Sequence, residues 1–273
     1  MSRVSNNLIG ILNFLTLLLS IPILGAGIWL AHKGSTDCER FLEKPVIIIG
    51  VFLLLVSLAG LIGACFRVSW LLWVYLLVMF LLIVLLFCFT IFAFVVTNSG
   101  AGRTLSDRGY KEYKLGDYSN WLQKRVSDGK NWNKIKSCLI DGKVCNSMAS
   151  TTATTPTVTE FYSEHLSAIQ SGCCKPADEC NFEYVSPTVW NKPTAANSTN
   201  ADCTLWDNDV NTLCFNCGSC KAGFLDNLKS DWKKVAIINI IFLVVLVIVY
   251  SIGCCAFRNS RAEKAYPRYS GYP

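Results

Sequence analysis

Apolar residues are gathered in four long blocks along this chain, and polar residues fill the stretches between them. The blocks cover residues 8–30, 46–65, 70–96 and 235–256, and none contains Asp, Glu, Lys or Arg. A bilayer core about 30 Å thick is crossed by roughly 20 apolar residues in a helix, and a charged side chain at its centre costs at least about 2.5 kcal/mol. The pattern therefore predicts four transmembrane helices.

The blocks leave an N-terminus, a small loop, a short turn, a large loop and a tail, which cover residues 1–7, 31–45, 66–69, 97–234 and 257–273. The first block is longer than the apolar region of a signal peptide, and no small-residue cleavage site ends it, so we expect it to stay in the protein. Only the large loop is long enough to enclose a water-soluble core of its own.

Nine of the 14 cysteines lie in the large loop. Such density predicts a disulfide framework formed in an oxidising compartment, although the spacing leaves the connectivity open. Nine is an odd number, and a tenth cysteine in the small loop restores parity, which indicates that it is bridged too. The ten disulfide candidates are Cys38, Cys138, Cys145, Cys173, Cys174, Cys180, Cys203, Cys214, Cys217 and Cys220. We therefore predict an all-α membrane protein: four transmembrane helices and a disulfide-rich, mainly helical large extracellular loop.

The orientation follows from cysteines, a sequon and basic residues. The sequon at Asn197 is a potential glycosylation site and, like the cysteines, places the large loop outside the cell. Both termini are then cytoplasmic, and these inner segments hold six Lys or Arg residues and one acid. Three cysteines at the inner helix ends, Cys65, Cys254 and Cys255, are candidates for palmitoylation; the alternative is that they are small apolar residues filling the helix ends.

Polar side chains inside the predicted spans are few. Asn13 and Asn239 are expected to form hydrogen bonds between helices, each contributing about 0.6–2 kcal/mol. No ionisable residue lies at membrane depth, whereas pumps and transporters usually need one, so a channel or transporter is disfavoured. Small residues four positions apart, such as Gly60 and Ala64, favour close helix packing.

The large loop has a helical part and an irregular part. Periodic apolar positions predict helix over about 107–140 with a break at Gly129, and a short helix over 161–169. An apolar face from Phe224 to Val235 continues directly into the fourth span. Between these helices, about 172–217 shows little periodicity, so we expect an irregular lobe held by cysteines rather than by a core.

Two further expectations concern the surface of the large loop. Trp190 and Trp206 are expected to be exposed on the irregular lobe. Residues 99–143 carry ten basic and five acidic groups, whereas residues 144–234 carry six basic and ten acidic groups. The basic half could face acidic headgroups or cell-surface polymers, but ordinary solvated helix faces are the favoured interpretation.

Two overlapping C-x-x-C spacings join Cys214, Cys217 and Cys220. Inside a cell they would indicate zinc, an iron–sulfur cluster or a redox pair; outside it, structural disulfides are favoured. A four-span thiol oxidoreductase that uses this cluster, with Cys217 and Cys220 as its reactive pair, is the competing hypothesis. No Ser/His/Asp set, phosphate loop or carboxylate pair stands out, so we expect no catalytic residue, metal, cofactor or nucleic-acid partner.

The motif Gly172-Cys173-Cys174-Lys175-Pro176, set in four spans with a small and a large outer loop, resembles the signature of plant tetraspanins. Asn13 matches the polar residue of that family's first span, and the inner cysteines lie where the family is palmitoylated. The segment 110–116 resembles the branch, similar to tetraspanin-8, that is linked to extracellular vesicles. Span three lacks the acidic or amide residue common in animal members, so contacts of that residue are not transferred.

The resemblance implies a non-enzymatic organiser of the plasma membrane, of extracellular vesicles and of endosomes. Its expected partners are membrane lipids, other membrane proteins and other tetraspanins, in homo- and hetero-oligomers. The roles implied are cell differentiation, development and defence.

Overall fold

The computed structural model describes residues 2–33, 37–66, 68–98, 100, 102–105, 108–149, 156–193 and 199–265. The chain divides into two compact units. The membrane unit is formed by residues 1–35, 39–92 and 236–273, and the loop unit is formed by residues 36–38 and 93–235.

In the described part of the chain, four helices are long and apolar enough to cross a membrane. They are α1 (Ser2–Lys33), α2 (Asp37–Cys65), α3 (Ser69–Thr97) and α10 (Gly218–Ala265). Each extends beyond its apolar block, so most of the small loop expected over 31–45 is helical. The segment after Asp37 is rich in Glu, Arg and Lys, which favour helix, and it therefore extends α2 beyond the apolar block.

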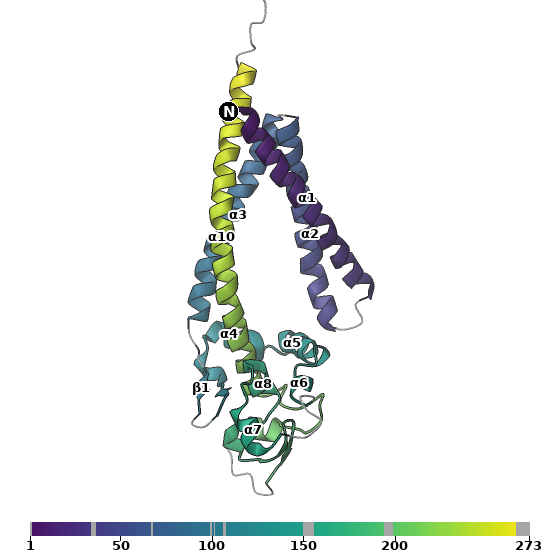
Figure 1. Cartoon of the computed structure of the whole chain (residues 1–273), viewed down its shortest axis with the longest axis vertical. Helices are drawn as coiled ribbons and strands as arrows, with labels where there is room; N and C mark the ends of the chain where they lie inside the picture. Colours follow the sequence, from purple (N-terminus) through teal and green to yellow (C-terminus); the bar gives the residue numbers. More distant parts are fainter. Residues whose placement is uncertain are drawn as a thin grey trace, which may run out of the picture. The chain divides into compact units, whose positions relative to one another are not determined.

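Within the membrane unit, α1 lies beside α2 and α3 lies beside α10 (Figure 1). Glycines allow the first pair to approach closely. A Cβ added at Gly27 would lie 2.8 Å from Cγ1 of Ile47, and one added at Gly50 would lie 3.1 Å from Cα of Leu24. Lipid tails are as apolar as leucine, so close van der Waals contact takes the place of the hydrophobic effect between these helices.

The two predicted asparagines form hydrogen bonds between helices in the membrane unit. Asn13 donates from Nδ2 to the Ile9 carbonyl at 2.9 Å and to the Tyr75 hydroxyl of α3 at 3.4 Å. Asn239 of α10 donates to Thr90 Oγ1 of α3 at 2.6 Å. The polar groups therefore tie both α1 and α10 to α3.

The loop unit contains short helices and two small antiparallel hairpins. Its helices are α4 (Asn120–Ser127), α5 (Gly129–Asp141), α6 (Asn146–Ala149), α7 (Val158–Ser163), α8 (Ala168–Cys173) and α9 (Asp202–Leu205), with 3-10 turns η1 (Leu115–Asp117) and η2 (Asp178–Cys180). The hairpins pair β1 (Arg103–Thr104) with β2 (Lys111–Glu112), and β3 (Glu183–Ser186) with β4 (Val189–Asn191).

The helix predicted over 107–140 begins only at Asn120. The chain before it is held by the tertiary contact of Gly109, whose N–H donates to the Tyr162 carbonyl at 2.9 Å. A Cβ at Gly109 would lie 2.4 Å from the Ser163 carbonyl oxygen, so this position requires glycine. The predicted break at Gly129 is confirmed, because Asp128 ends α4 and caps α5 by accepting a hydrogen bond from Asn131 N.

The expectation that the lobe lacks a core, with Trp190 and Trp206 exposed, is wrong. Their side chains are 4% and 1% exposed. Phe161 lies at the centre of an aromatic cluster, with its ring centroid 5.1 Å from that of Tyr184 and 5.9 Å from that of Trp190. Asn208 holds the two tryptophans together, because its Oδ1 accepts hydrogen bonds from Trp206 Nε1 and Trp190 N.

Candidate functional site

All ten predicted cysteines are paired in the loop unit. The bonds are Cys38–Cys138, Cys145–Cys174, Cys173–Cys220, Cys180–Cys203 and Cys214–Cys217. The lobe, defined as residues 172–217, is crossed or closed by four of them. The adjacent pair at the end of α8 bonds in two directions, Cys173 to α10 and Cys174 to the segment after α5. The adjacent cysteines therefore fix the end of α8 between α10 and the segment that follows α5.

Gly172 allows α8 to touch the first turn of α10. A Cβ at this position would lie 2.4 Å from the Ser219 carbonyl oxygen, and one at Gly223 would lie 2.2 Å from the Ala168 carbonyl oxygen. Ser219 Oγ also donates to the Gly172 carbonyl at 3.1 Å. The backbones of the two helices are thus in direct contact, and the Cys173–Cys220 bond closes the same crossing.

Lys175 is a buried cation, and its side chain is 0% exposed. Its ammonium donates to Glu112 Oε1 at 2.7 Å and to Asp178 Oδ1 at 3.4 Å, and lies 4.6 Å from the ring centroid of Tyr110. Glu112 also accepts from the Asp178 N–H at 3.1 Å. A buried charge requires such partners, and here they join β2 to the turn η2.

A second cation extends this network. The guanidinium of Arg108 lies 3.1 Å from the ring centroid of Tyr162, and its Nε is 3.7 Å from Asp178 Oδ2. Burial is the main cause of the raised pKa of Tyr110, and Asp178 raises it further. Sequence reasoning missed Arg108, Glu112 and Asp178, because single charged residues in irregular segments carry no periodic signal.

Tyrosines anchor α10 to the segment before α4. Tyr118 donates from its hydroxyl to Asp226 Oδ1 at 3.3 Å. Burial, followed by the nearby Asp226 carboxylate, raises the pKa of Tyr113 to about 12. Both effects disfavour the phenolate, so these tyrosines are neutral hydrogen-bond donors at ordinary pH.

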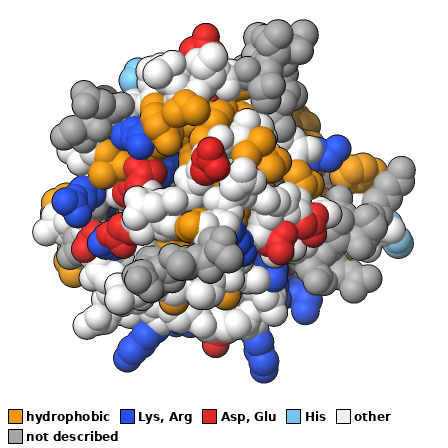
Figure 2. All heavy atoms as spheres, turned by 90° about the horizontal axis from the view of Figure 1, so that it is seen from below, with side chains coloured by type: hydrophobic (Ala, Val, Ile, Leu, Met, Phe, Trp, Pro, Cys, Tyr) orange, Lys and Arg blue, Asp and Glu red, His pale blue; other side chains and the backbone are white. Residues whose placement is uncertain are grey.

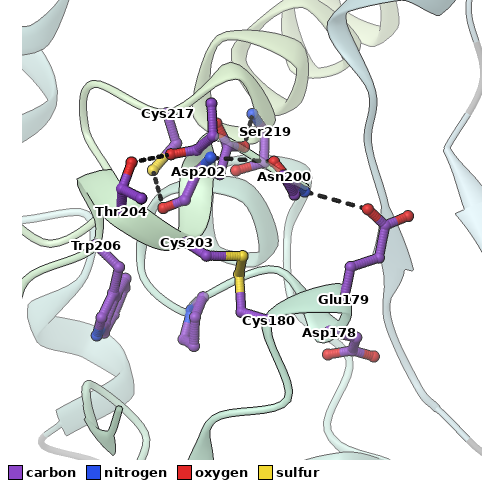
Figure 3. The surroundings of a disulfide bond; sticks show 12 residues. Asp178, Glu179, Cys180, Asn200, Asp202, Cys203, Thr204, Trp206, Cys217 and Ser219 are labelled. Atoms are coloured by element: carbon purple, nitrogen blue, oxygen red, sulfur yellow. Dashed lines mark hydrogen bonds between the residues drawn. A yellow bond between two sulfur atoms is a disulfide. The ribbon is translucent and has the colours of Figure 1, made fainter. Parts of the chain in front are cut away.

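Asp202 caps the first turn of α10 from across the lobe. Its carboxylate accepts hydrogen bonds from Gly218 N at 2.7 Å and Ser219 N at 2.8 Å. Figure 3 shows this cap above the Cys180–Cys203 bond, with Asn200 linking it toward Glu179. A carboxylate at a helix N-terminus satisfies otherwise unpaired N–H groups and the helix dipole.

A hollow of about 360 Å³ lies beside this cap. The Lys114–Glu179 pair at its wall is 2.6 Å long, and the hydrogen bond from Lys114 is the main cause of the lowered pKa of Glu179. Glu112 and Asp202, the other carboxylates of the wall, are bound to Lys175 and to the α10 amides. The three carboxylates that line the hollow are therefore already bound to groups of the protein itself.

Comparison with known proteins decides the family. The model of the Tetraspanin family matches residues 5–256. This chain belongs to the tetraspanin family. Tetraspanin-8 of Arabidopsis thaliana is 66% identical over 272 residues, which cover 100% of this chain and 99% of that relative. Tetraspanin-7 of the same plant is 61% identical over 261 residues, with 96% and 98% covered. Protein TORNADO 2, also of Arabidopsis thaliana, is 48% identical over 269 residues, with 98% of each chain covered. No solved structure is significantly similar.

The resemblance to plant tetraspanins of the tetraspanin-8 branch is thereby confirmed. Family membership and the four apolar helices make this tetraspanin a multi-pass membrane protein. They also support a membrane scaffold role, with membrane proteins and lipids as partners. Members of the family are generally non-enzymatic scaffolds.

The oxidoreductase hypothesis is not favoured for this tetraspanin. Cys217 and Cys220 do not pair with each other: Cys217 bonds to Cys214, and Cys220 bonds to Cys173. All of these side chains are 0% exposed, so no sulfur of the cluster faces a substrate. Among the described residues, no group of three or more His, Cys, Asp or Glu side chains is placed to hold a metal ion.

The predicted palmitoylation candidates lie in the membrane unit. Cys65 and Cys255 are free and exposed, and Cys254 is free and half-buried. Asn197, the predicted glycosylation site, lies outside the described residues.

Proposed function

We propose that this plant tetraspanin is a non-enzymatic organiser that clusters partner proteins and lipids in plasma-membrane microdomains and extracellular vesicles, and that it serves cell differentiation, development or defence. The observation that supports this proposal is the structure of the lobe. Its cysteines are all bonded, and the motif residues Cys173, Cys174 and Lys175 make contacts inside the protein. The framework therefore holds the outward side chains in a fixed arrangement, which lowers the entropy cost of binding a partner.

The outward face of the β3–β4 hairpin is the proposed recognition surface. Val185 is 49% exposed and Val189 is 36% exposed, while the neighbouring Trp190 points into the core. In the space-filling view, hydrophobic side chains form separate patches between charged ones (Figure 2). A mixture of apolar and charged side chains is typical of interfaces that form and dissociate.

The membrane unit supports a lipid-sorting role. We propose that both termini are cytoplasmic and that Cys65, Cys254 and Cys255 carry acyl chains. All three are free; Cys65 is the last residue of α2, and Cys254 and Cys255 lie where the apolar stretch of α10 ends. An apolar groove of about 490 Å³ between α3 and α10 is lined by residues such as Phe87 and Val244 and fits lipid tails. Palmitate on the inner cysteines would strengthen the association with ordered lipid.

Partner exchange tests the recognition surface. In full-length protein purified in mild detergent, the double variant Val185→Thr/Val189→Thr should lose part of the wild-type set of co-purifying membrane proteins, measured by quantitative proteomics. Thr keeps the strand preference and removes apolar surface. Val158→Thr makes the same chemical change at a 42% exposed position on α7 and should leave the set unchanged. Identical partner sets in all three proteins would refute recognition by the hairpin.

Further experiments test the topology and the modifications. We propose that Asn197 carries a glycan, so glycosidase treatment should increase the gel mobility of the wild type and leave Asn197→Gln unaffected. Acyl exchange should detect palmitate on the wild type and not on the Cys65→Ser/Cys254→Ser/Cys255→Ser variant. A fully accessible thiol at these positions in protein from its native membrane would contradict acylation.

A further inference from the structure

We infer that the free edge of β3 binds an extended, basic segment of a partner protein as a third strand of the hairpin, an assignment that rests on the proposed function of the β3–β4 hairpin. The hairpin is a two-stranded antiparallel sheet. Such a sheet has two edges, and each presents backbone N–H and C=O groups with which another strand can pair. In this hairpin the two edges differ.

The edge of β4 is already closed by a side chain. Asn208 Oδ1 accepts a hydrogen bond from Trp190 N at 3.0 Å, and Asn208 Nδ2 donates to the Trp190 carbonyl at 3.1 Å. The amide therefore binds both backbone groups of one residue, as a neighbouring strand would. A partner strand could pair with Trp190 only by displacing Asn208, which also accepts from Trp206 Nε1 at 3.1 Å.

The edge of β3 is open at Tyr184, which lies opposite Trp190 in the antiparallel register. Because Trp190 directs its backbone groups to Asn208, these opposite residues form a pair without hydrogen bonds between them. The N–H and carbonyl of Tyr184 therefore point away from β4. Within the part of the chain that the structure describes, neither group has a partner. One residue thus offers a donor and an acceptor to an added strand.

The strand is accessible on one side and anchored on the other. Exposure alternates along β3, with Glu183 and Val185 at the exposed positions. The Tyr184 ring centroid lies 5.1 Å from that of Phe161 and 5.2 Å from that of Trp190, so the core holds β3 from its inner side. The edge is therefore in place before a partner binds, which lowers the entropy cost of adding a strand.

Acidic side chains surround this edge. Glu183 is exposed and, among the described residues, has no ion pair. Burial is the main cause of the raised pKa of Tyr184, and the carboxylates of Glu164 and Glu160 raise it further. Lys192, which follows β4, is turned to the lobe, because its ammonium donates to a backbone carbonyl there. The charge next to the edge is therefore negative.

This charge selects the occupant. A second copy of this chain would bring its own acids to the edge and be repelled, whereas Lys or Arg of a partner strand would be attracted to Glu183. Residues with branched side chains favour the extended conformation and can pack on Val185, which is 49% exposed. A segment that alternates basic and β-branched residues therefore fits both features.

Binding of a synthetic strand tests this assignment with full-length protein in neutral detergent micelles. The probe is a fluorescent peptide of alternating lysine and threonine, which should bind saturably and more weakly in added salt. The same peptide methylated on every backbone nitrogen keeps the side chains and the charge but cannot form the ladder, so it should bind about tenfold more weakly. Equal affinities would mean that charge alone holds the peptide, and would overturn strand addition.

Hydrogen exchange locates the bound peptide. The lysine–threonine peptide should slow amide exchange in the β3 segment that contains Tyr184 and leave the other hairpin, β1–β2, unchanged. Protection of β3 that grows with protein concentration in the absence of peptide would indicate a second copy on this edge. That result would contradict a basic partner.

Charge variants test the choice of occupant. Glu183→Gln should lower the affinity for the lysine–threonine peptide about threefold. Asp117→Asn removes the same charge from an exposed position in η1 and should bind like the wild type. Equal losses in the two variants would show a net-charge effect, and equal binding of a glutamate–threonine peptide would show that charge does not select the strand. Either result overturns the basic partner.

Strand addition and the proposed recognition surface can fail separately. If Val185→Thr/Val189→Thr changes the set of co-purifying proteins but no peptide protects β3, recognition by the hairpin stands and strand addition is refuted. If the peptide protects β3 and the set of co-purifying proteins is unchanged, strand addition stands and recognition through the two valines is refuted.

Discussion

The membrane unit and the loop unit are built on opposite principles. Apolar side chains of the spans are largely exposed, for example Ile48 at 68% and Leu85 at 64%, whereas the loop buries its aromatic residues, with Phe161 at 0%. Water drives apolar side chains together in the loop, and lipid exerts no such force between the spans. Helix contact in the membrane therefore depends on close packing and a few polar bonds.

The difference extends to how each unit fixes its arrangement. The loop is cross-linked by five disulfides and a buried cation, both of which resist rearrangement. The described spans are joined by glycine contacts and by bonds such as Asn239 to Thr90. We infer that the loop holds a definite surface while the spans retain freedom to adjust, a combination suited to a scaffold that carries a recognition domain in lipid.

The largest expected effect comes from opening a long disulfide loop. Cys173→Ser/Cys220→Ser removes a bond across 47 residues and should destabilise the loop unit by about 4 kcal/mol. Cys214→Ser/Cys217→Ser removes a bond across 3 residues and should cost about 1.5 kcal/mol. Resistance of the loop to proteolysis during denaturant titration measures both. The helix content of the spans should persist, and equal losses from the two pairs would contradict the loop-closure argument.

A smaller effect is expected from the buried cation. Lys175→Met leaves Glu112, 14% exposed, without its main partner and should cost about 3 kcal/mol in the stability of the loop unit. Adding Glu112→Gln should restore part of this loss, because the uncompensated charge is removed. Lys114→Met breaks an exposed pair and is the matched control, with no measurable change expected. Thermal unfolding in detergent distinguishes them, and equal melting points would count against a structural role for Lys175.

The membrane unit was the easier part to predict from the sequence, because a bilayer imposes a length and excludes charge. The uncharged blocks located all four long apolar helices, and the parity of the cysteines included Cys38. The disulfide pairing could not be predicted from the sequence, because it depends on contacts such as that of Gly172 with Ser219, which form only in the folded chain.

The core of the lobe could not be predicted for a different reason. Strands of three or four residues, such as β3 and β4, are too short to show alternation, so Trp190 looked like a loop residue. The burial of Lys175 could not be predicted from the sequence either, because lysine is among the residues least often buried. Its burial is recognisable only once Glu112 and Asp178 are seen around it.

Glycine substitutions test the difference between the loop unit and the spans through smaller expected changes in stability. Gly172→Ala places a Cβ 2.4 Å from backbone oxygen of Ser219, which is itself held by the adjacent disulfide, and should cost about 2 kcal/mol. Gly116→Ala, with no atom within 4 Å of the new Cβ, should be neutral or slightly stabilising. In the spans, Gly50→Ala meets Leu24 at 3.1 Å and should cost less than Gly172→Ala, because the helices can shift. Chemical denaturation of the loop measures the loss in stability for Gly172→Ala and Gly116→Ala, and thermal melting of the spans measures it for Gly50→Ala. A larger loss for Gly50→Ala than for Gly172→Ala would mean that the loop is the more adaptable unit.

The smallest effect concerns the polar bond between α10 and α3. Asn239→Leu removes a donor 2.6 Å from Thr90 Oγ1 and should destabilise the helix pair by about 1 kcal/mol or less, because Leu fits the lipid well and the unfolded helices find other partners. Thr90 also donates to the Leu86 carbonyl at 2.7 Å, so its hydroxyl keeps a partner when Asn239 is lost. A double-mutant cycle with Thr90→Val, followed by thermal melting in detergent, isolates the coupling at about 0.6 kcal/mol. A coupling well above 2 kcal/mol would mean that polar bonds dominate the spans as disulfides dominate the loop, and the contrast between the two units would then fail.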